Sequence, residues 1–174
     1  EVHWRDYAAN KVILCQGFAG LDSGVFSTLA HRSAKGEMLT VEIPGLDADR
    51  ILNRNGWIVP LGQNKWRAGA TYEWDDMSTE ATEVGREAVE QKVADLTPLR
   101  FKVLEHEVGV RPIIQRSQPV IGFHPKLPSV GFFNGLGSKG VITAPSVAAH
   151  FAEILVNGGE LDPELSLDRL TFSS

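Results

Sequence analysis

The residues best suited to chemistry lie in a glycine-rich segment over 134–145, which reads Asn-Gly-Leu-Gly-Ser-Lys-Gly-Val-Ile-Thr-Ala-Pro. Gly135, Gly137 and Gly140 allow positive φ angles and a close approach of the backbone to a ligand. The apolar run over 130–133 predicts a short buried strand, and the apolar spacing after Pro145 predicts a helix over 145–156. The free N–H groups and positive dipole end of that helix could hold an electron-rich group.

The same segment matches the dinucleotide fingerprint G-x-G-x-x-G. That motif opens a βαβ unit in which the helix begins inside the glycine run. Here Pro145 would interrupt a helix already under way, although it suits a first helical turn. The short polar tail also leaves little room for a second parallel strand, so the pyrophosphate-binding interpretation is not favoured. A glycine-rich turn without a ligand is the simplest alternative.

Arg111 is the leading candidate for binding a substrate. It ends a predicted strand over 102–112, between Val110 and Pro112. Burying a guanidinium there is costly without an anionic partner, and its planar fork matches a carboxylate through two hydrogen bonds. An internal ion pair is the alternative. Tyr72 is a second candidate because its hydroxyl could donate to a carboxylate, although tyrosines more often simply pack their rings.

Several further segments accompany these candidates in a characteristic order: Val-Ile-Leu-Cys-Gln-Gly-Phe-Ala at 12–19, Trp-Ile-Val-Pro at 57–60, Gly-Ala-Thr-Tyr-Glu at 69–73, Val-Gly-Val-Arg-Pro at 108–112 and Asp-Pro-Glu-Leu at 162–165. With the glycine turn, their order and spacing resemble the C-terminal half of the FAD-dependent amino-acid and amine oxidoreductases. This is the superfamily of D-amino-acid oxidase, glycine oxidase and sarcosine oxidase. The resemblance covers nearly the whole chain.

The resemblance implies roles for the candidate residues. The arginine of the G-x-R-P pattern, here Arg111, would pair with the substrate carboxylate, and Tyr72 would lie on the substrate-binding domain. The glycine turn would face the pyrimidine edge of the flavin, where backbone N–H groups stabilise negative charge. Because covalent flavin would need a cysteine and the only one, Cys15, is far from the turn in sequence, FAD is expected to be non-covalent. The implied FAD contacts are Gly17, Gly135, Leu136, Gly137, Ser138, Lys139 and Gly140.

The implied activity is oxidation of the CH–NH group of an amino acid or a secondary amine. The hydride would pass to FAD, and dioxygen or a quinone would reoxidise it. No side-chain acid or base is required, because a neutral bound amine can release a hydride directly. A glycerol-3-phosphate or 2-hydroxy-acid dehydrogenase is an alternative, but Arg116 is the only further basic residue close to Arg111 in sequence, which favours a carboxylate. A cofactor-free binding module is the second alternative.

Composition argues against several other kinds of partner, namely nucleic acid, a membrane and a metal ion. The chain has 174 residues, a formal net charge of −5 and no basic stripe, which argues against a nucleic-acid partner. No apolar run approaches membrane-spanning length, no signal-peptide pattern opens the chain, and a lone cysteine fits a reducing compartment. We therefore expect a cytoplasmic protein without a membrane partner. The five histidines and the cysteine show no metal-ligand spacing, so no metal site is expected.

The order of the predicted elements indicates an α+β fold. A substrate-binding domain over 34–112, with an antiparallel or mixed sheet, is inserted into a doubly wound, Rossmann-like FAD-binding domain. Residues 1–33 and 113–174 form the C-terminal part of that domain. The family's G-x-G-x-x-G lies near the true N-terminus, whereas this chain begins without Met. We therefore expect the missing N-terminal Rossmann half of the same protein to be its partner.

Local patterns predict most of the elements. Residues 11–15 read as a strand with a buried, inert Cys15, and the alternation over 39–43 predicts a half-buried strand. Turns at 54–56 and 62–65 indicate an antiparallel meander. Ser78 or Thr79 is expected to cap the next helix, which Thr97 and Pro98 end. Residues 105–107, Glu-His-Glu, are expected to form a solvated edge.

The two main helices each have a predicted apolar face at helical spacing. The face of the first is Val84, Ala88, Val89, Val93 and Leu96, and that of the last is Val147, Ala148, Phe151, Ile154 and Leu155.

Overall fold

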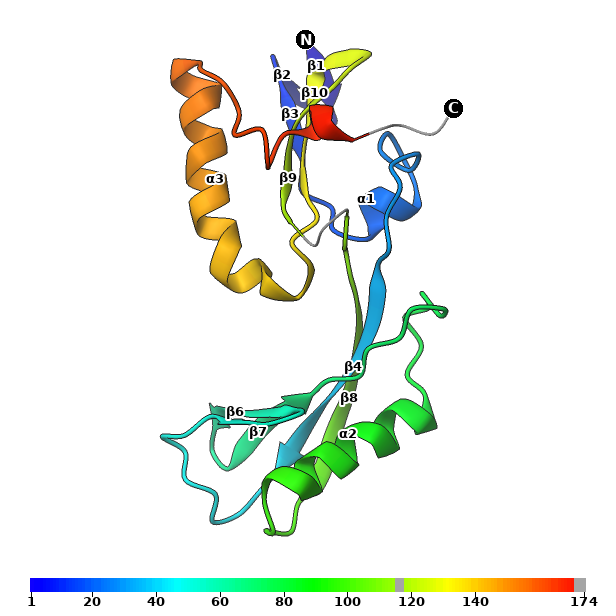
Figure 1. Ribbon diagram of the computed structural model, residues 1–174, viewed down its shortest axis with the longest axis vertical. Helices are drawn as coiled ribbons and strands as arrows, with labels where there is room; N and C mark the ends of the chain where they lie inside the picture. Colours follow the sequence, from blue (N-terminus) through cyan, green and yellow to red (C-terminus); the bar gives the residue numbers. More distant parts are fainter. Residues whose placement is uncertain (115–117, 171–174) are drawn as a thin grey trace. The chain divides into compact units, whose positions relative to one another are not determined.

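The computed structural model describes residues 1–114 and 118–170 and divides into two units (Figure 1). Unit 1 consists of Glu1–Ser33 and Arg111–Ser174, and unit 2 of Ala34–Val110. Both units combine helices with sheets, so the fold is α+β, as predicted in its broad class. Unit 2 is thus continuous in sequence, whereas unit 1 is assembled from the chain on either side of it.

Unit 2 is built on a five-stranded sheet with the strand order β5-β6-β7-β4-β8. The strands β5, β6 and β7 form the predicted antiparallel meander, and β7 continues it onto β4. Gln63 and Asn64, between β6 and β7, have φ angles of 54° and 57°, as a tight two-residue hairpin turn requires. The bounds are β4 Ala34–Glu42, β5 Leu52–Asn53, β6 Trp57–Gly62, β7 Lys65–Gly69 and β8 Lys102–Arg111.

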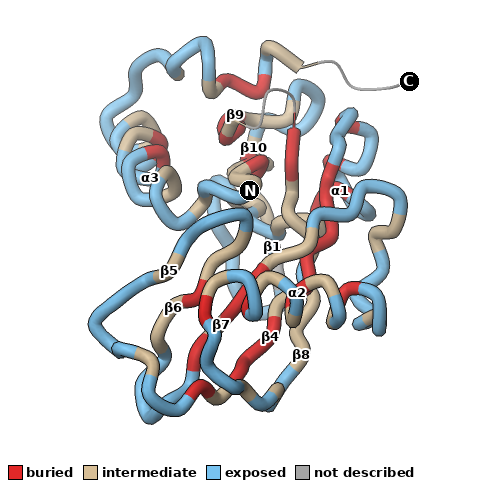
Figure 2. Tube along the Cα trace, turned by 60° about the horizontal axis from the view of Figure 1, so that its bottom comes forward, coloured by how far each residue is buried: buried red, intermediate tan, exposed pale blue. Residues whose placement is uncertain are grey.

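The core of unit 2 lies between this sheet and helix α2, Glu83–Leu96. Leu39, Val41 and Ile43 are fully buried, as predicted, but Thr40 between them is buried as well, so this strand is not the half-buried strand that the alternation predicted. Figure 2 shows the buried stretches along β4 and β7. The remaining members of the cluster are Ile58, Trp66, Ala68, Val89 and Val93.

The start of α2 differs from the prediction. Thr82, not Ser78 or Thr79, is the N-cap, and its Oγ1 accepts from the Gly85 N–H over 2.9 Å. The Ser78 hydroxyl is instead engaged by a lysine of β4. Val84 is exposed because it precedes the buried Val89 by five residues, which places it about 140° around the helix.

Unit 1 contains a three-stranded sheet with the order β3-β10-β9 and a separate hairpin of β1 and β2. β3 is parallel to β10, and β9 is antiparallel to it. Alternate residues face opposite sides of a strand. Accordingly, Ile121 packs with α3 on one face, and Phe132 packs with α1 and η3 residues on the other. The bounds are β1 Val2–Trp4, β2 Tyr7–Ala9, β3 Val12–Leu14, α1 Ala19–Asp22, β9 Val120–His124, β10 Leu127–Asn134, η2 Gly137–Lys139, α3 Gly140–Asn157 and η3 Leu167–Arg169.

Helix α3 begins earlier than predicted. It starts at Gly140, inside the glycine run, and Pro145 lies within it, so the argument from Pro145 against such a start was wrong. A proline removes one intrahelical hydrogen bond, which this 18-residue helix accommodates. Beyond the helix, the chain returns beside β9 only as an isolated parallel bridge between Ile121 and Ser166 in the described part.

Helix α3 also corrects an expectation about membranes. Within the described ranges, one helical stretch, Gly137–Asn157, is long and apolar enough to cross a membrane by length and composition alone. Val147 and Phe151 of this stretch are buried in the core of unit 1, as predicted, whereas Ala148 is exposed.

The position of Cys15 also differs from the prediction. β3 ends at Leu14 and the chain turns at Gly17, so Cys15 lies outside the strand with an exposed side chain. Partial burial still raises the pKa of the Cys15 thiol above its usual value, which keeps the reactive thiolate scarce.

Candidate functional site

The glycine turn lies where two parallel strands end. The chain leaves β3 through Gly17 and leaves β10 through Gly135. Asn134, buried at 2 % exposure, joins them. Its Nδ2 donates to the Gly17 carbonyl over 2.7 Å, and its Oδ1 accepts from the Gly135 N–H over 2.9 Å. The carboxyl ends of parallel strands are where open α/β sheets bind ligands. Sequence reasoning did not give Asn134 this role, although an Asn-Gly pair closing an apolar strand was a usable signal.

The shape of the turn depends on its glycines. Gly17, Gly135 and Gly137 have φ angles of 58°, 76° and 54°, a region that side chains disfavour. Gly140 instead has a helical φ of −54°. The other predicted contacts differ in exposure: Leu136 is half-buried, and Ser138 and Lys139 are exposed.

The start of α3 supplies hydrogen-bond donors. In residues 118–170, no side chain caps this helix at its N-cap, Lys139. The first N–H groups of a helix have no intrahelical partner, and the dipole is positive there. Val141 and Ile142, in the first turn, are largely exposed. Apolar side chains at the positive end of a helix suit a flat ligand with an electron-rich edge.

Arg111 directly precedes Pro112, whose backbone contacts the glycine turn. The Gly137 N–H donates to the carbonyl of Pro112 over 3.0 Å, and the Arg32 N–H donates to that of Ile113 over 2.9 Å. Unit 1 thereby holds the segment after β8 against the glycine turn. Arg111 itself is half-buried. Arg116, the further basic residue considered from the sequence, lies outside the described residues.

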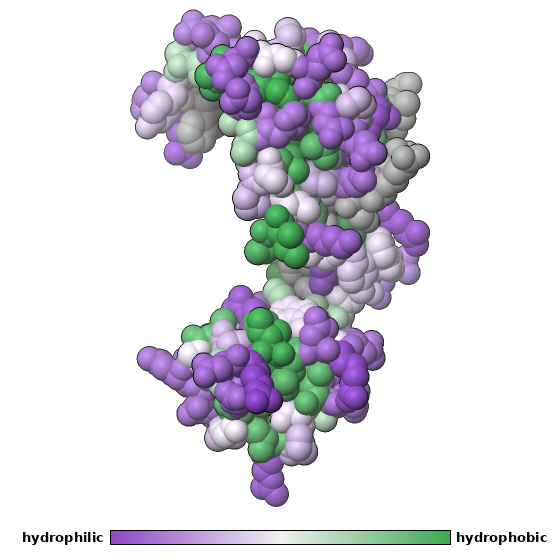
Figure 3. Space-filling model, turned by 60° about the vertical axis from the view of Figure 1, so that its left-hand side comes forward, coloured by the Kyte–Doolittle hydropathy of each residue, from purple (hydrophilic) through white to green (hydrophobic). Residues whose placement is uncertain are grey.

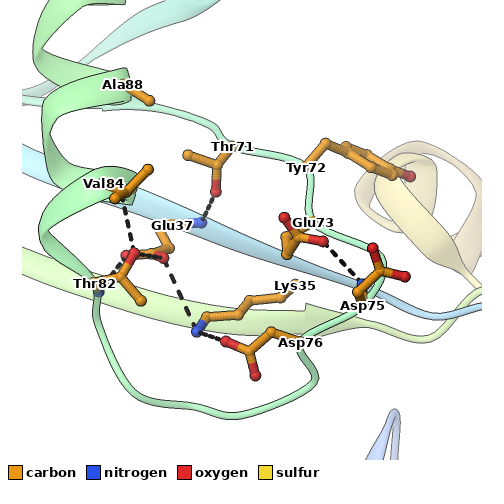
Figure 4. A pocket seen from close by; sticks show the side chains of 11 residues that line it. Lys35, Glu37, Thr71, Tyr72, Glu73, Asp75, Asp76, Thr82, Val84 and Ala88 are labelled. Carbon is orange, nitrogen blue, oxygen red and sulfur yellow. Dashed lines mark hydrogen bonds and ion pairs between the residues drawn. The ribbon is translucent and has the colours of Figure 1, made fainter.

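A second polar site lies wholly within unit 2, around a cavity of about 530 Å³ (Figure 4). The Lys35 ammonium, 1 % exposed, lies 2.6 Å from Asp76 Oδ2 and donates to Ser78 Oγ over 3.0 Å. Glu37 accepts from the Thr82 N–H over 2.9 Å and from its hydroxyl over 2.7 Å. These contacts tie the segment between β7 and α2 to strand β4.

The carboxylates of this site are held in their ionised form. Burial raises the pKa of Glu37, but hydrogen bonds from Thr82 and the charges of His106 and Lys35 outweigh it and lower the pKa below its usual value. A hydrogen bond from Lys35 is the main cause that lowers the pKa of Asp76 to about 2. The site is therefore an ion-pair network whose charges largely satisfy one another.

Two members of the expected solvated edge instead lie close to polar side chains of other strands in unit 2. His106 Nε2 lies 2.8 Å from Glu37 Oε2, with 18 % of the His106 side chain exposed. Glu107 Oε2 lies 2.6 Å from Arg67 Nη2. The prediction was wrong because both partners are distant in sequence and become neighbours only when the sheet forms.

Tyr72 lies on the segment after β7, in unit 2. Its side chain is largely exposed, and its ring centroid is 4.9 Å from that of Trp74. Figure 4 shows the ring directed away from Glu37 and Lys35. Tyr72 and Arg111 belong to different units, and the structure describes each within its own unit.

Comparisons with known proteins agree with this layout. A family model described as FAD dependent oxidoreductase matches residues 2–154. Glycine oxidase of Bacillus subtilis (strain 168) is 28 % identical over 160 residues, covering 87 % of this chain and 42 % of that protein. Two solved structures, iminodiacetate oxidase from Chelativorans sp. BNC1 and glycine oxidase from Geobacillus kaustophilus, each have a TM-score of 0.78 at 22 % identity.

Those two structures share the fold over 92 % and 94 % of this chain, which covers 46 % of each of them. The chain thus spans less than half the length of the relatives that it matches. Because the family model matches well over half of its residues, the chain belongs to the family of FAD dependent oxidoreductases.

Proposed function

We propose that this chain is the C-terminal part of a flavoprotein that oxidises the CH–NH group of an amino acid or a secondary amine. The observation that carries the proposal is the hydrogen bond from Gly137 to Pro112, which joins the glycine turn to the segment of Arg111. The segment that carries Arg111, whose guanidinium can bind a carboxylate, thereby adjoins a helix start that can hold an electron-rich cofactor edge. An amino-acid substrate and a flavin need these two features side by side.

Each candidate residue has a role in this proposal. Arg111 holds the substrate carboxylate through two hydrogen bonds and so fixes one orientation of the reacting carbon. Gly17 and residues 135–140 contact the pyrimidine edge of non-covalent FAD, and backbone N–H groups at the start of α3 favour negative charge there. Tyr72, on the substrate-binding unit, adds a hydroxyl donor. No side chain is assigned as an acid or a base.

Bound FAD would supply the hydride acceptor, with dioxygen or a quinone as the final acceptor. The remaining part of the protein, corresponding to the length of the relatives that this chain does not match, would provide the other cofactor contacts. Glycine and iminodiacetate, named in the matched relatives, are the first substrates to try.

The Arg111 role is tested in the protein extended by the coding region that precedes this chain. Arg111→Ala should lower kcat/KM for an amino acid by about 3 kcal/mol in transition-state binding, roughly 100-fold, because a charged hydrogen-bonded pair is lost. The loss should be much smaller for an amine without a carboxylate. Arg100→Ala, which removes an exposed arginine of unit 2, is the control.

An equal kcat/KM for wild type and Arg111→Ala would exclude the carboxylate role. Oxidation of glycerol 3-phosphate, with none of amino acids or amines, would favour the alternative dehydrogenase of the same layout.

A further inference from the structure

Asn134 is a buried amide in apolar surroundings. It is the last residue of β10 and is 2 % exposed, and its partner on β9, Val120, is fully buried. Ile114, whose side chain lies beside Gly135, is 1 % exposed. Burying an amide costs free energy, and its hydrogen bonds do little more than recover that cost. Packing alone therefore does not account for an asparagine at this position.

The two ends of the Asn134 amide bind the turns that follow two different strands. Its Nδ2 donates to the Gly17 carbonyl after β3, and its Oδ1 accepts from the Gly135 N–H after β10. β3 and β10 lie side by side and run parallel, so both turns begin at the same edge of the sheet (Figure 1). An aspartate of the same shape could not donate to the carbonyl when ionised, and a leucine could make neither bond.

The turn after β3 depends on hydrogen bonds more than on close packing. Gly17 has a φ angle of 58°, and a Cβ there would meet nothing within 4 Å. Its carbonyl accepts from the Asn134 amide over 2.7 Å and from the Gly20 N–H over 3.3 Å. Glycine has many other conformations available, and of these two bonds only the one from Asn134 ties the turn to β10.

The turn after β10 leads to an exposed apolar surface. The Gly137 N–H donates to the Pro112 carbonyl, and the chain then enters α3, where Val141 and Ile142 are 94 % and 82 % exposed. Figure 3, in which the left-hand side of Figure 1 is turned forward, shows hydrophobic side chains among polar ones on the surface. Asn134 is buried behind the turn, so it acts on a ligand of this surface through the backbone that it holds.

We infer that Asn134 is a positioning residue for FAD. Its amide holds the turns after β3 and β10 in one relative arrangement, in which both contact the cofactor. The inference rests on the proposed function. Because the turns are ordered before FAD arrives, the entropic cost of ordering them falls on folding and not on binding, which strengthens binding.

The FAD affinity of the protein extended by its preceding coding region tests the inference. Asn134→Leu fills a similar volume but makes neither hydrogen bond, so the Gly17 carbonyl and the Gly135 N–H are free to turn toward water. Its Kd for FAD, measured by flavin fluorescence where each variant is folded, should rise at least about tenfold. Asn134→Ala, which cannot overpack the site, should weaken binding similarly.

The control removes another buried hydrogen-bonding group of unit 1. Ser166 is 8 % exposed, and its hydroxyl accepts from the Asp168 N–H over 3.2 Å. Ser166→Ala should lower the thermal midpoint and leave the Kd for FAD unchanged, because this group contacts neither turn.

Hydrogen exchange in the FAD-free extended protein separates positioning from a general loss of stability. In Asn134→Leu, exchange at the Gly135 amide should be at least about tenfold faster, because this N–H loses its acceptor. Exchange at Ile121, whose N–H donates to the Leu165 carbonyl over 2.8 Å, should change much less.

Wild-type FAD affinity in both Asn134 variants, or unchanged exchange at Gly135, would overturn the inference and leave the proposed function standing. An equal loss of affinity in Ser166→Ala would also overturn it, since the stability of unit 1 would then be the cause. An extended wild-type protein that binds no FAD would instead overturn the proposed function, and this inference with it.

Discussion

The most discriminating prediction for unit 2 concerns Gly85, in the first turn of α2. On helix propensity alone, Gly85→Ala should stabilise the protein by about 1 kcal/mol. The structure reverses that sign, because a Cβ at Gly85 would overlap the carboxylate of Glu37. That carboxylate accepts hydrogen bonds from the N–H and the hydroxyl of Thr82, so it cannot move away from the added Cβ without weakening these bonds.

The size of the destabilisation follows from the two hydrogen bonds between Glu37 and Thr82. Displacing Glu37 weakens two hydrogen bonds to a buried charge, each worth about 1.5–3 kcal/mol. After the propensity gain of about 1 kcal/mol, loss of both bonds in Gly85→Ala should lower the free energy of unfolding by about 2–5 kcal/mol. Urea unfolding monitored by tryptophan fluorescence measures it. Gly109→Ala is the matched control, because a Cβ there meets nothing within 4 Å.

A double-mutant cycle isolates the cause. In a Glu37→Ala background the overlap is gone, so adding Gly85→Ala should be neutral or stabilising. The reasoning fails if Gly85→Ala stabilises the wild-type protein, or if it costs as much with Glu37 removed as with Glu37 present.

Three further predictions concern other groups. Asn134→Ala should destabilise unit 1 by about 2 kcal/mol, since two buried hydrogen bonds are lost; an unchanged thermal midpoint would contradict this. The pKa of Asp76 is lowered to about 2, chiefly by the hydrogen bond from Lys35, so its contribution to stability is present above about pH 4 and is lost as the pH falls toward 2. Acid unfolding should therefore depend less steeply on pH in Asp76→Asn, and an identical profile would refute the link. Cys15→Ser should leave the flavin content of the extended protein unchanged, and acid should release that flavin from the protein. A loss of bound flavin in Cys15→Ser would indicate a covalent link through Cys15.

Much of the fold could be predicted because its signals are local. Leu39, Val41 and Ile43 form a buried apolar row of one strand, and the Gln63-Asn64 turn has backbone angles that few residues adopt. The burial of Thr40 between them was not predicted, because it depends on neighbours outside the strand. The glycine turn after the apolar strand could also be predicted from the sequence, because the backbone of this turn has positive φ angles that favour glycine.

The misjudged features depend on contacts between distant segments. Thr82 replaces Ser78 as the cap of α2 because Glu37, on β4, holds Thr82 while Lys35 engages Ser78. His106 is largely buried for the same reason, because its partner Glu37 lies on another strand that is distant in sequence. The spacing of residues within one segment does not predict such contacts between segments.

Helix α3 shows a different limit of sequence reasoning. Pro145 was expected to prevent a helix from starting before it. The 18-residue helix nevertheless contains Pro145, because its packed face stabilises it against the loss of one hydrogen bond. Asn134 was overlooked because its two partners, Gly17 and Gly135, become neighbours only when β3 and β10 pair in parallel. The predicted roles of Arg111 and Tyr72 stay predictions, which the kinetic variants address.

The most direct test of the central claim is the visible absorption spectrum of the protein extended by its preceding coding region. The spectrum is recorded anaerobically before and after addition of glycine, iminodiacetate or an N-methyl amino acid. The account predicts a flavin band that one of these substrates bleaches and that air or a quinone restores. A colourless protein that added FAD does not reconstitute would contradict it, as would a flavin band that no amino acid or amine reduces.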